Sequence, residues 1–227
     1  MNETGPNNAG LEQRENVSAT QGVMFFLKRQ SVSLYLVSAC FVLAALVFVF
    51  YTVKTNRDNE QASRLLGIAQ TSKQFEELFR QYPKSSAAPA ALLALASSRF
   101  SAGDYDSAFD LYGEFIQKYP RHSMLSAAEL GKVMCSEARG EMEMALMGFN
   151  AFLQAYPDSY LTPQALFGKA RCLQATGKIP EARIVYENFI AAHPESKWRQ
   201  QAESALQLLD RQMRLNRKSG KPNDSGS

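Results

Sequence analysis

Few residues of this chain have the type and spacing that catalysis or metal binding requires. The sequence of 227 residues contains three cysteines and two histidines, His122 and His193. It has no Cys-x-x-Cys, His-Glu-x-x-His, glycine-rich phosphate loop or nucleophile-elbow pattern. Glu141 and Glu143 form a carboxylate pair, but we expect them in the first turn of a helix, where the helix dipole favours negative charge. We therefore expect no enzymatic activity, no metal and no cofactor.

Two of the cysteines have a spacing that excludes a disulfide. Cys135 and Cys172 are 37 residues apart, and Ser98 stands another 37 residues upstream. Equivalent residues of adjacent stacked helical repeats lie about 8–10 Å apart, whereas a disulfide needs Cα atoms within about 7 Å. The two cysteines are therefore predicted to be small buried thiols.

The spacing of 37 residues runs through most of the chain. Tyrosine–proline pairs end at Pro83, Pro120 and Pro157, and the pair His193-Pro194 follows at the same spacing. The same shift relates six further series: Ala91, Ala128 and Ala165; Gly103, Gly140 and Gly177; Ala108, Ala145 and Ala182; Tyr112, Phe149 and Tyr186; Phe115, Phe152 and Phe189; and Leu93, Leu130 and Phe167. Such agreement over three copies indicates an array of stacked repeats.

Each repeat is predicted to contain two helices, the first of them at residues 87–102, 124–139 and 161–176. A serine after each proline, such as Ser159, is expected to cap the first helix, and a glycine such as Gly140 suits the left-handed position at its end. Proline ends the second helix because it lacks an N–H group and restricts the preceding residue. On each second helix an alanine and two aromatic residues share one face, so the recurrent residues are predicted to form the core. His193, at the tyrosine position, is expected to pack in the same way.

The helix pairs resemble the tetratricopeptide repeat (TPR). Their Phe-x-x-Phe-x-x-x-Tyr-Pro-x-Ser ending is similar to that of the bacterial subtype found in the ancillary subunit of the Sec translocon, the outer-membrane β-barrel assembly lipoprotein and a cell-division coordinator. The resemblance covers residues 74–215, although residues such as Leu92 and Ala96 replace the usual first-helix aromatic and glycine. It implies an all-α fold, namely an α-solenoid of TPR helix pairs preceded by one transmembrane helix.

In this family, ligands lie along the groove made by the first helices. Carried over by position, the groove candidates are Leu93, Ser97, Phe100, Leu130, Met134, Glu137, Phe167, Arg171 and Gln174. An apolar groove that contains methionine suits extended or amphipathic segments of other proteins. Leu93, Leu130 and Phe167 recur at one position of the repeat, however, and the alternative is that they pack against the partner helix.

An uncharged run of 23 residues, from Ser31 to Val53, is predicted to cross a lipid bilayer. A helix of this length extends about 34 Å, enough for a hydrocarbon core of about 30 Å. The alternatives are a buried core helix, a cleavable signal peptide, and lipidation of Cys40 within a sequence that resembles a lipobox. The run is longer than the first two require, and an apolar stretch follows Cys40 where a mature lipoprotein would become polar.

The charges that flank this run do not fix its orientation. Lys28 and Arg29 precede it, and Lys54, Arg57 and Arg64 follow it. The resemblance to the translocon-associated type implies a single-pass protein of the inner (cytoplasmic) membrane, with its repeats in the periplasm or otherwise outside the cytoplasm.

The chain is accordingly divided into nine segments. They are a disordered N-terminus (1–21), a juxtamembrane segment (22–30), the transmembrane helix (31–53), a membrane-proximal helix or half-repeat (54–83), three TPRs (84–120, 121–157 and 158–194), a capping helix (195–215) and a disordered tail (216–227).

These features together predict a binding function. A net charge of +3 is too small to indicate nucleic acid as a partner. We expect a membrane-anchored protein–protein interaction module that acts as a scaffold or chaperone-like accessory factor for envelope proteins, with other proteins and the bilayer as its partners. The alternatives are a dedicated assembly factor of an envelope, division or wall-synthesis complex, and a homo-oligomer in which the solenoid self-associates as a structural tether.

Overall fold

The computed structural model describes residues 9–218, which form nine α-helices and no β-strand. The chain divides into two compact units, residues 1–58 and residues 59–227. Helix α1 (Ala9–Ile68) provides the described part of the first unit and the beginning of the second.

Helix α1 carries the apolar run. Between Val37 and Ile68 it is long and apolar enough to cross a membrane, with a mean hydropathy of 2.1, and none of the residues in its apolar window is buried by protein. Phe41 and Phe50, for example, are 73% and 71% exposed. A helix from the chain's own core would bury such side chains, so this alternative does not fit the structure.

Both expected disordered ends overlap helices. Helix α1 already begins at Ala9, within the segment expected to be disordered, and residues 1–8 lie outside the described part of the chain. Extending an existing helix fixes one residue per hydrogen bond, whereas starting a helix is costly, so a polar segment continues a helix that an apolar neighbour has formed. At the other end, α9 (Arg199–Lys218) includes most of the expected capping helix, and residues 219–227 are not described.

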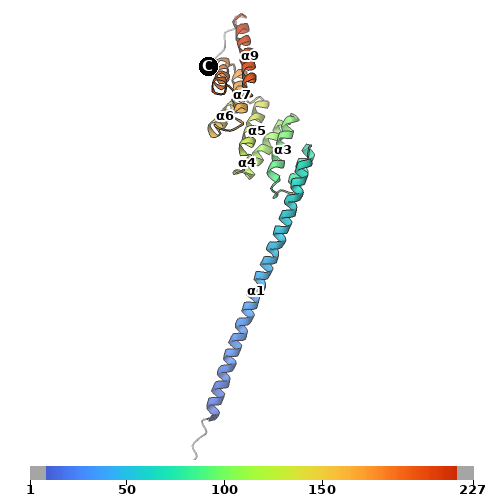
Figure 1. Ribbon diagram of the computed structural model, residues 1–227, viewed down its shortest axis with the longest axis vertical. Coiled ribbons are helices and arrows are strands. Elements are labelled where there is room, and N and C mark those ends of the chain that lie inside the picture. Colours follow the sequence, from blue (N-terminus) through green and yellow to red (C-terminus); the bar gives the residue numbers. More distant parts are fainter. Residues whose placement is uncertain (1–8, 219–227) are drawn as a thin grey trace, which may run out of the picture. The chain divides into compact units, whose positions relative to one another are not determined.

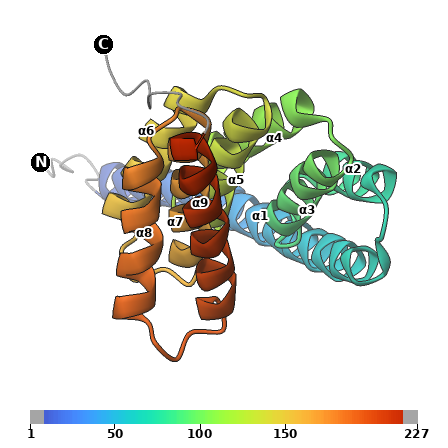
Figure 2. The ribbon, with the colours of Figure 1, turned by 90° about the horizontal axis from the view of Figure 1, so that it is seen from above.

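The second unit is a succession of antiparallel helix pairs (Figure 1). Its helices after α1 are α2 (Ser72–Gln81), α3 (Ala88–Ser101), α4 (Tyr105–Lys118), α5 (Leu125–Ala138), α6 (Met142–Ala155), α7 (Thr162–Ala175), α8 (Ile179–Ala192) and α9. The first helices α3, α5 and α7 agree with the predicted ranges to within one residue. From α2 onward each helix packs against the next, as α8 and α9 do in Figure 2. The predicted all-α solenoid is therefore confirmed.

The two kinds of connection within the solenoid have different physical causes. Gly103, Gly140 and Gly177 end the first helices with φ values of 81°, 82° and 78°, the left-handed conformation predicted for them. The serine prediction holds at the start of α7, where the Ser159 hydroxyl oxygen accepts a hydrogen bond of 3.2 Å from the N–H of Leu161, although the N-cap residues of α3, α5 and α7 make no side-chain capping bond themselves. The Ser159 N–H also closes the preceding turn by donating to the Tyr156 carbonyl over 3.2 Å.

The recurrent alanine and aromatic residues fill the core, as predicted. Phe115 and Phe149 are fully buried on α4 and α6, and burying such a side chain contributes about 2–3 kcal/mol. The aromatic ring at position 149 lies against Gly168 of the next first helix, where an added Cβ atom would meet the Phe149 Cζ atom at 2.2 Å. Cys135 and Cys172 are buried free thiols, which confirms that prediction.

The end of α1 belongs to the solenoid. Ala62 is fully buried in a cluster with Leu78 of α2, and Leu66 packs against the same cluster. The Asn59 side-chain oxygen accepts a hydrogen bond of 2.8 Å from the Ser86 N–H. The segment expected to be a half-repeat therefore contains parts of two helices, residues 59–68 of α1 and the whole of α2.

Candidate functional site

The nine groove candidates separate into buried and accessible side chains. Leu130 and Phe167 are only 2% and 3% exposed and belong to core clusters, and Leu93 packs partly buried against another cluster. These three residues thus do what the packing alternative stated. The remaining six, which we call the first-helix face, lie on α3, α5 and α7 and are at least partly accessible: Ser97, Phe100, Met134, Glu137, Arg171 and Gln174.

Polar contacts connect the first helices across the repeats. The Arg171 guanidinium donates to both carboxylate oxygens of Glu137 over 2.6 and 2.9 Å, which links α7 to α5 and raises the pKa of Arg171. The Gln164 amide lies 3.1 Å from the Met134 sulfur. A two-point ion pair of this kind fixes both side chains in position as well as attracting them.

The α3 part of the first-helix face is less polar. Phe100 stacks at an angle on Tyr105, with ring centroids 5.2 Å apart. Ser97 is exposed, and burial raises the pKa of the neighbouring Tyr112 hydroxyl of α4 to about 12. The face therefore changes from aromatic and hydroxyl groups on α3 to charged and amide groups on α7.

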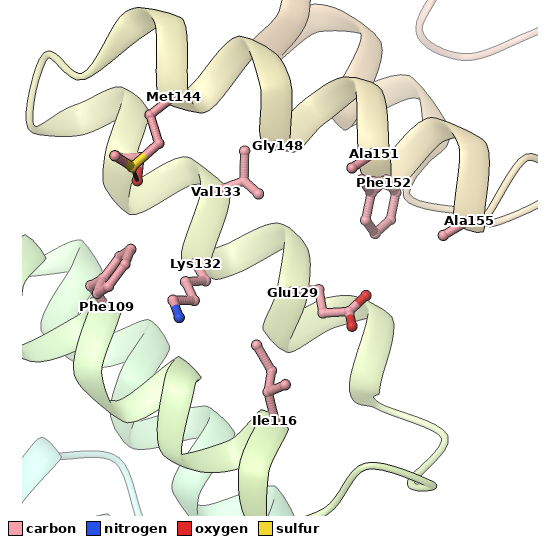
Figure 3. Close-up of a pocket in the computed structure, with 11 residues that line it drawn as sticks. Phe109, Ile116, Glu129, Lys132, Val133, Met144, Gly148, Ala151, Phe152 and Ala155 are labelled. Carbon is pink, nitrogen blue, oxygen red and sulfur yellow. Dashed lines mark hydrogen bonds between the residues drawn. The ribbon is translucent and has the colours of Figure 1, made fainter.

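A second concave region lies on other helices and was not predicted. A cleft of about 550 Å³ separates α4 from α6 and has α5 as its floor (Figure 3). We call it the α4–α6 cleft and define it by six of its lining residues: Phe109 and Ile116 of α4, Lys132 and Val133 of α5, and Gly148 and Ala151 of α6.

The 37-residue register explains why the α4–α6 cleft is apolar. Two of its positions hold larger or polar residues in the preceding and following repeats: Gly148 corresponds to Leu111 and Val185, and Ala151 corresponds to Glu114 and Asn188. An added Cβ atom on Gly148 would lie 2.7 Å from a methyl carbon of Val133, so the glycine also allows α6 to approach α5. Val133 in turn replaces an alanine in both other repeats, Ala96 and Ala170.

The charges around the cleft are unevenly paired. Arg139 forms ion pairs with Asp106 and Glu141, at 3.0 and 2.9 Å. The Lys132 ammonium lies 4.5 Å from the centroid of the Phe109 ring and has no carboxylate within ion-pair distance among the described residues. Lys132 therefore has no ion-pair partner among the described residues, although Glu129 also lines the cleft.

Sequence reasoning missed the cleft because it compared variable residues of the repeats only on the first helices, and not on the second helices α4 and α6. The signal was present in the positions that do not recur. Between Met144 and Ala155, helix α6 carries no charged residue, whereas α4 has Asp110, Glu114 and Lys118 in the corresponding stretch.

Neither surface has the groups that a metal would require. Within the described residues, no cluster of three or more histidine, cysteine, aspartate or glutamate side chains is positioned to hold an ion. Burial raises the pKa of Cys135 and of Cys172 to about 11, so both thiols are protonated at neutral pH and are poor nucleophiles. Both surfaces instead offer area for contact with another molecule.

Comparisons with known proteins agree with this description. Residues 58–167 match the model of the family YfiO, described as an outer membrane lipoprotein, and residues 164–196 match a tetratricopeptide repeat model. No curated protein matches the sequence.

Two solved structures have a similar fold. A point variant of the nearly identical TPR-like repeats of a kinesin light chain candidate from Podosopora anserina is 16% identical, with a TM-score of 0.50, and the match covers 74% of this chain and 97% of that one. A tetratricopeptide repeat protein from Parabacteroides merdae ATCC 43184 is 15% identical, with a TM-score of 0.50, over 69% of this chain and 60% of that one. At these identities the likeness shows the fold, a TPR solenoid, and nothing finer.

Proposed function

We propose that this chain is a membrane-anchored protein-interaction module whose first-helix face binds segments of other proteins. The TPR solenoid supports the general part of this proposal, because repeats of this kind present extended surfaces for protein binding. Helix α1 is the proposed anchor.

The observation that carries the proposal is the division between recurrent and variable residues. Positions that recur at 37 residues are mostly buried, whereas equivalent positions on the first-helix face hold different chemistry in each repeat. One such position is Ser97, Met134 and Arg171 in turn, and another is Phe100, Glu137 and Gln174. The exposed residues thus differ from repeat to repeat, whereas the buried residues that support them are the same. Such a surface can recognise a partner whose own sequence does not repeat.

The cellular setting is the finer part of the proposal. The match to an outer membrane lipoprotein family supports a role in the bacterial envelope, and the apolar helix supports attachment to a membrane. We place the chain in the inner membrane with its repeats outside the cytoplasm because its layout resembles that of the translocon-associated type. There the chain would act as a scaffold or chaperone-like factor for envelope proteins. Two alternative functions differ from this scaffold in what the chain binds. A dedicated assembly factor would bind one defined partner, and a self-associating tether would bind further copies of itself.

Site-specific photocrosslinking in membranes tests the binding surface. A photoreactive residue at Ser97, Phe100 or Gln174 leaves the Glu137–Arg171 ion pair intact, and the exposed Asn188 of α8 is the control position. We expect capture of several envelope proteins from the three test positions and little from Asn188. Capture of a single stoichiometric partner would favour the dedicated assembly factor, and capture of the chain itself would favour the tether. Equal capture from Asn188 would refute the first-helix face as the binding surface.

The side of the membrane needs its own measurement. Alkaline phosphatase fused after Ser227 is expected to be active, because this enzyme needs an oxidising compartment outside the cytoplasm to form its disulfides. An inactive fusion, together with a fluorescent cytoplasmic reporter at the same position, would reverse the proposed topology.

A further inference from the structure

The α4–α6 cleft differs from its neighbours in chemistry rather than in size. The corresponding cleft between α2 and α4 has a volume of about 590 Å³, but charged groups such as Glu76 and Arg99 line it. Arg99 lies 3.4 Å from Glu76 and 3.5 Å from Asp104, and Asp110 also lines this cleft. Covering charged groups with an apolar ligand costs free energy, so the α4–α6 cleft suits such a ligand better.

The third repeat shows what kind of group fits the space. At the position of Gly148 it has Val185, which packs partly buried against the core together with Leu166. The chain itself thus places an aliphatic side chain where the second repeat leaves an opening between Gly148 and Val133. An aliphatic group from outside would find the same surroundings there.

The apolar surface continues along α6. Met144, at one end of the cleft, is 54% exposed, and Met147 on the adjacent turn is 67% exposed. Methionine is enriched in protein interfaces and adapts its shape to different partners, whereas charged residues are depleted in interface cores. The uncharged wall of α6 has the composition of a binding surface.

The charge of Lys132 adds a second requirement for a ligand of the cleft. The Lys132 ammonium lies on the α4 side of the cleft, over the Phe109 ring, and the ion pairs of the described residues do not include it. Glu129, three residues earlier on α5, also lines the cleft, but it forms no ion pair with Lys132 among the described residues. A carboxylate on the bound segment would complement Lys132.

From these observations we propose that the α4–α6 cleft is a second binding site, which accepts a segment of another protein with aliphatic side chains next to an acidic residue. The aliphatic side chains contact Gly148, Val133 and Ala151, and the acidic residue pairs with Lys132. A short amphipathic helix meets both requirements, because residues three and four apart share one face. The site lies apart from the first-helix face and does not depend on it.

Two variants change the cleft with little change to the fold. V133A combined with G148V installs the pair that the third repeat already uses, Ala170 and Val185, and so fills the opening without the Cβ clash. K132E reverses the charge. N188A, at the exposed control position of α8, is the matched control, and F100A reports on peptides that bind the first-helix face. Thermal unfolding of each variant shows whether it is folded.

The experiment selects peptides from a random library displayed on phage, with the full chain in nanodiscs as the bait. We expect an enriched pattern of leucine, isoleucine or methionine beside aspartate or glutamate. Binding of the enriched peptides, measured by fluorescence anisotropy, should weaken by about tenfold or more in V133A/G148V and in K132E, which corresponds to about 1.4 kcal/mol or more, and should be unchanged in N188A.

Three results would each overturn the proposal. The first is that no peptide is enriched, the second is that the enriched peptides lack acidic residues, and the third is that the peptides still bind when V133A/G148V fills the cleft. Sedimentation of the chain in nanodiscs gives a further result of this kind, since a dimer that V133A/G148V dissociates would identify a second copy as the occupant. This experiment can fail while the crosslinking test succeeds, and the reverse. Peptides that bind the first-helix face would bind F100A more weakly and V133A/G148V equally well.

Discussion

At the scale of the residue, the glycine that ends each first helix is constrained by its backbone conformation and not by lack of space. Gly140 has a φ of 82°, a conformation that costs an L-residue with a side chain about 1–2 kcal/mol. We expect G140A to lower the free energy of unfolding by about that amount in urea titrations of the full chain in detergent.

Gly113 supplies the control for this measurement. It lies within helix α4, and an added Cβ atom would meet only the end of the Lys132 side chain, at 3.6 Å. Since alanine favours helices more than glycine does, G113A should be neutral or stabilising by up to about 1 kcal/mol. Equal losses in the two variants would contradict the explanation based on φ.

The buried thiols predict how stability depends on pH. Burial raises the pKa of Cys135 and of Cys172 to about 11 in the folded chain, whereas an unfolded cysteine titrates near about 8.5. A raised pKa gives stability that is complete below about pH 8.5 and is lost as the pH rises toward the folded value. The urea midpoint should therefore fall between about pH 8 and about pH 10, and C135A/C172A should make this part of the profile flatter. An unchanged slope would mean that other groups cause the loss.

Residue types alone predicted the scaffold but not every role within it. The glycines and thiols could be assigned because their chemistry allows few alternatives. The serine position was less certain, because a serine before a helix can bond either to the helix or to the turn: the Ser159 hydroxyl oxygen accepts from the Leu161 N–H at the start of α7, whereas the Ser85 hydroxyl donates to the Tyr82 carbonyl of the turn.

At the scale of the element, helix α9 closes the last core cluster through one face only. Leu209 is fully buried and Leu208, its neighbour, is 63% exposed. We expect L209A to lower the free energy of unfolding by about 2–4 kcal/mol, because it leaves a cavity against α8, and L208A to change it by less than about 0.5 kcal/mol. Thermal and urea unfolding of the two variants measure the difference, and similar values would show that α9 does not pack as described.

The helices could be predicted because their signals are local and are repeated three times. The α4–α6 cleft could not, because it depends on how Gly148 of one helix meets Val133 of another. These two positions lie in different helices, and each looks ordinary until their contact is known. The burial of Leu130 and Phe167 was open for the same reason, since a first helix has apolar neighbours on several sides.

At the scale of the whole molecule, the boundary between the two units makes a prediction about truncation. A fragment of residues 59–227 retains Ala62, Leu66 and the Asn59–Ser86 hydrogen bond, whereas a fragment of residues 70–227 loses all of them. We expect the longer fragment to melt as the solenoid does in the full chain, and the shorter fragment to be less stable by about 2–4 kcal/mol. Fragments of equal stability would show that the end of α1 is not part of the solenoid.

The sequence predicted both an apolar helix and a solenoid, but not where the one gives way to the other. Lys54 and Arg57 ended the predicted transmembrane helix, and the half-repeat after them was predicted to be either continuous with that helix or only close to it. The helix continues through them because residues 54–66 contain neither proline nor glycine, and Gly67 stands one residue before its end. Polarity changes at these charges, whereas backbone conformation does not.

The contact between Val133 and Gly148 also limits how the gene can change. A side chain on residue 148 and a branched side chain on residue 133 exclude each other, so the two codons cannot drift independently. A lineage that moves from the present pair toward that of the third repeat, Ala170 and Val185, must first accept a smaller residue at 133. Descendants of this gene are therefore expected to keep at least one of the two positions small, and those that enlarge residue 148 will have closed the cleft.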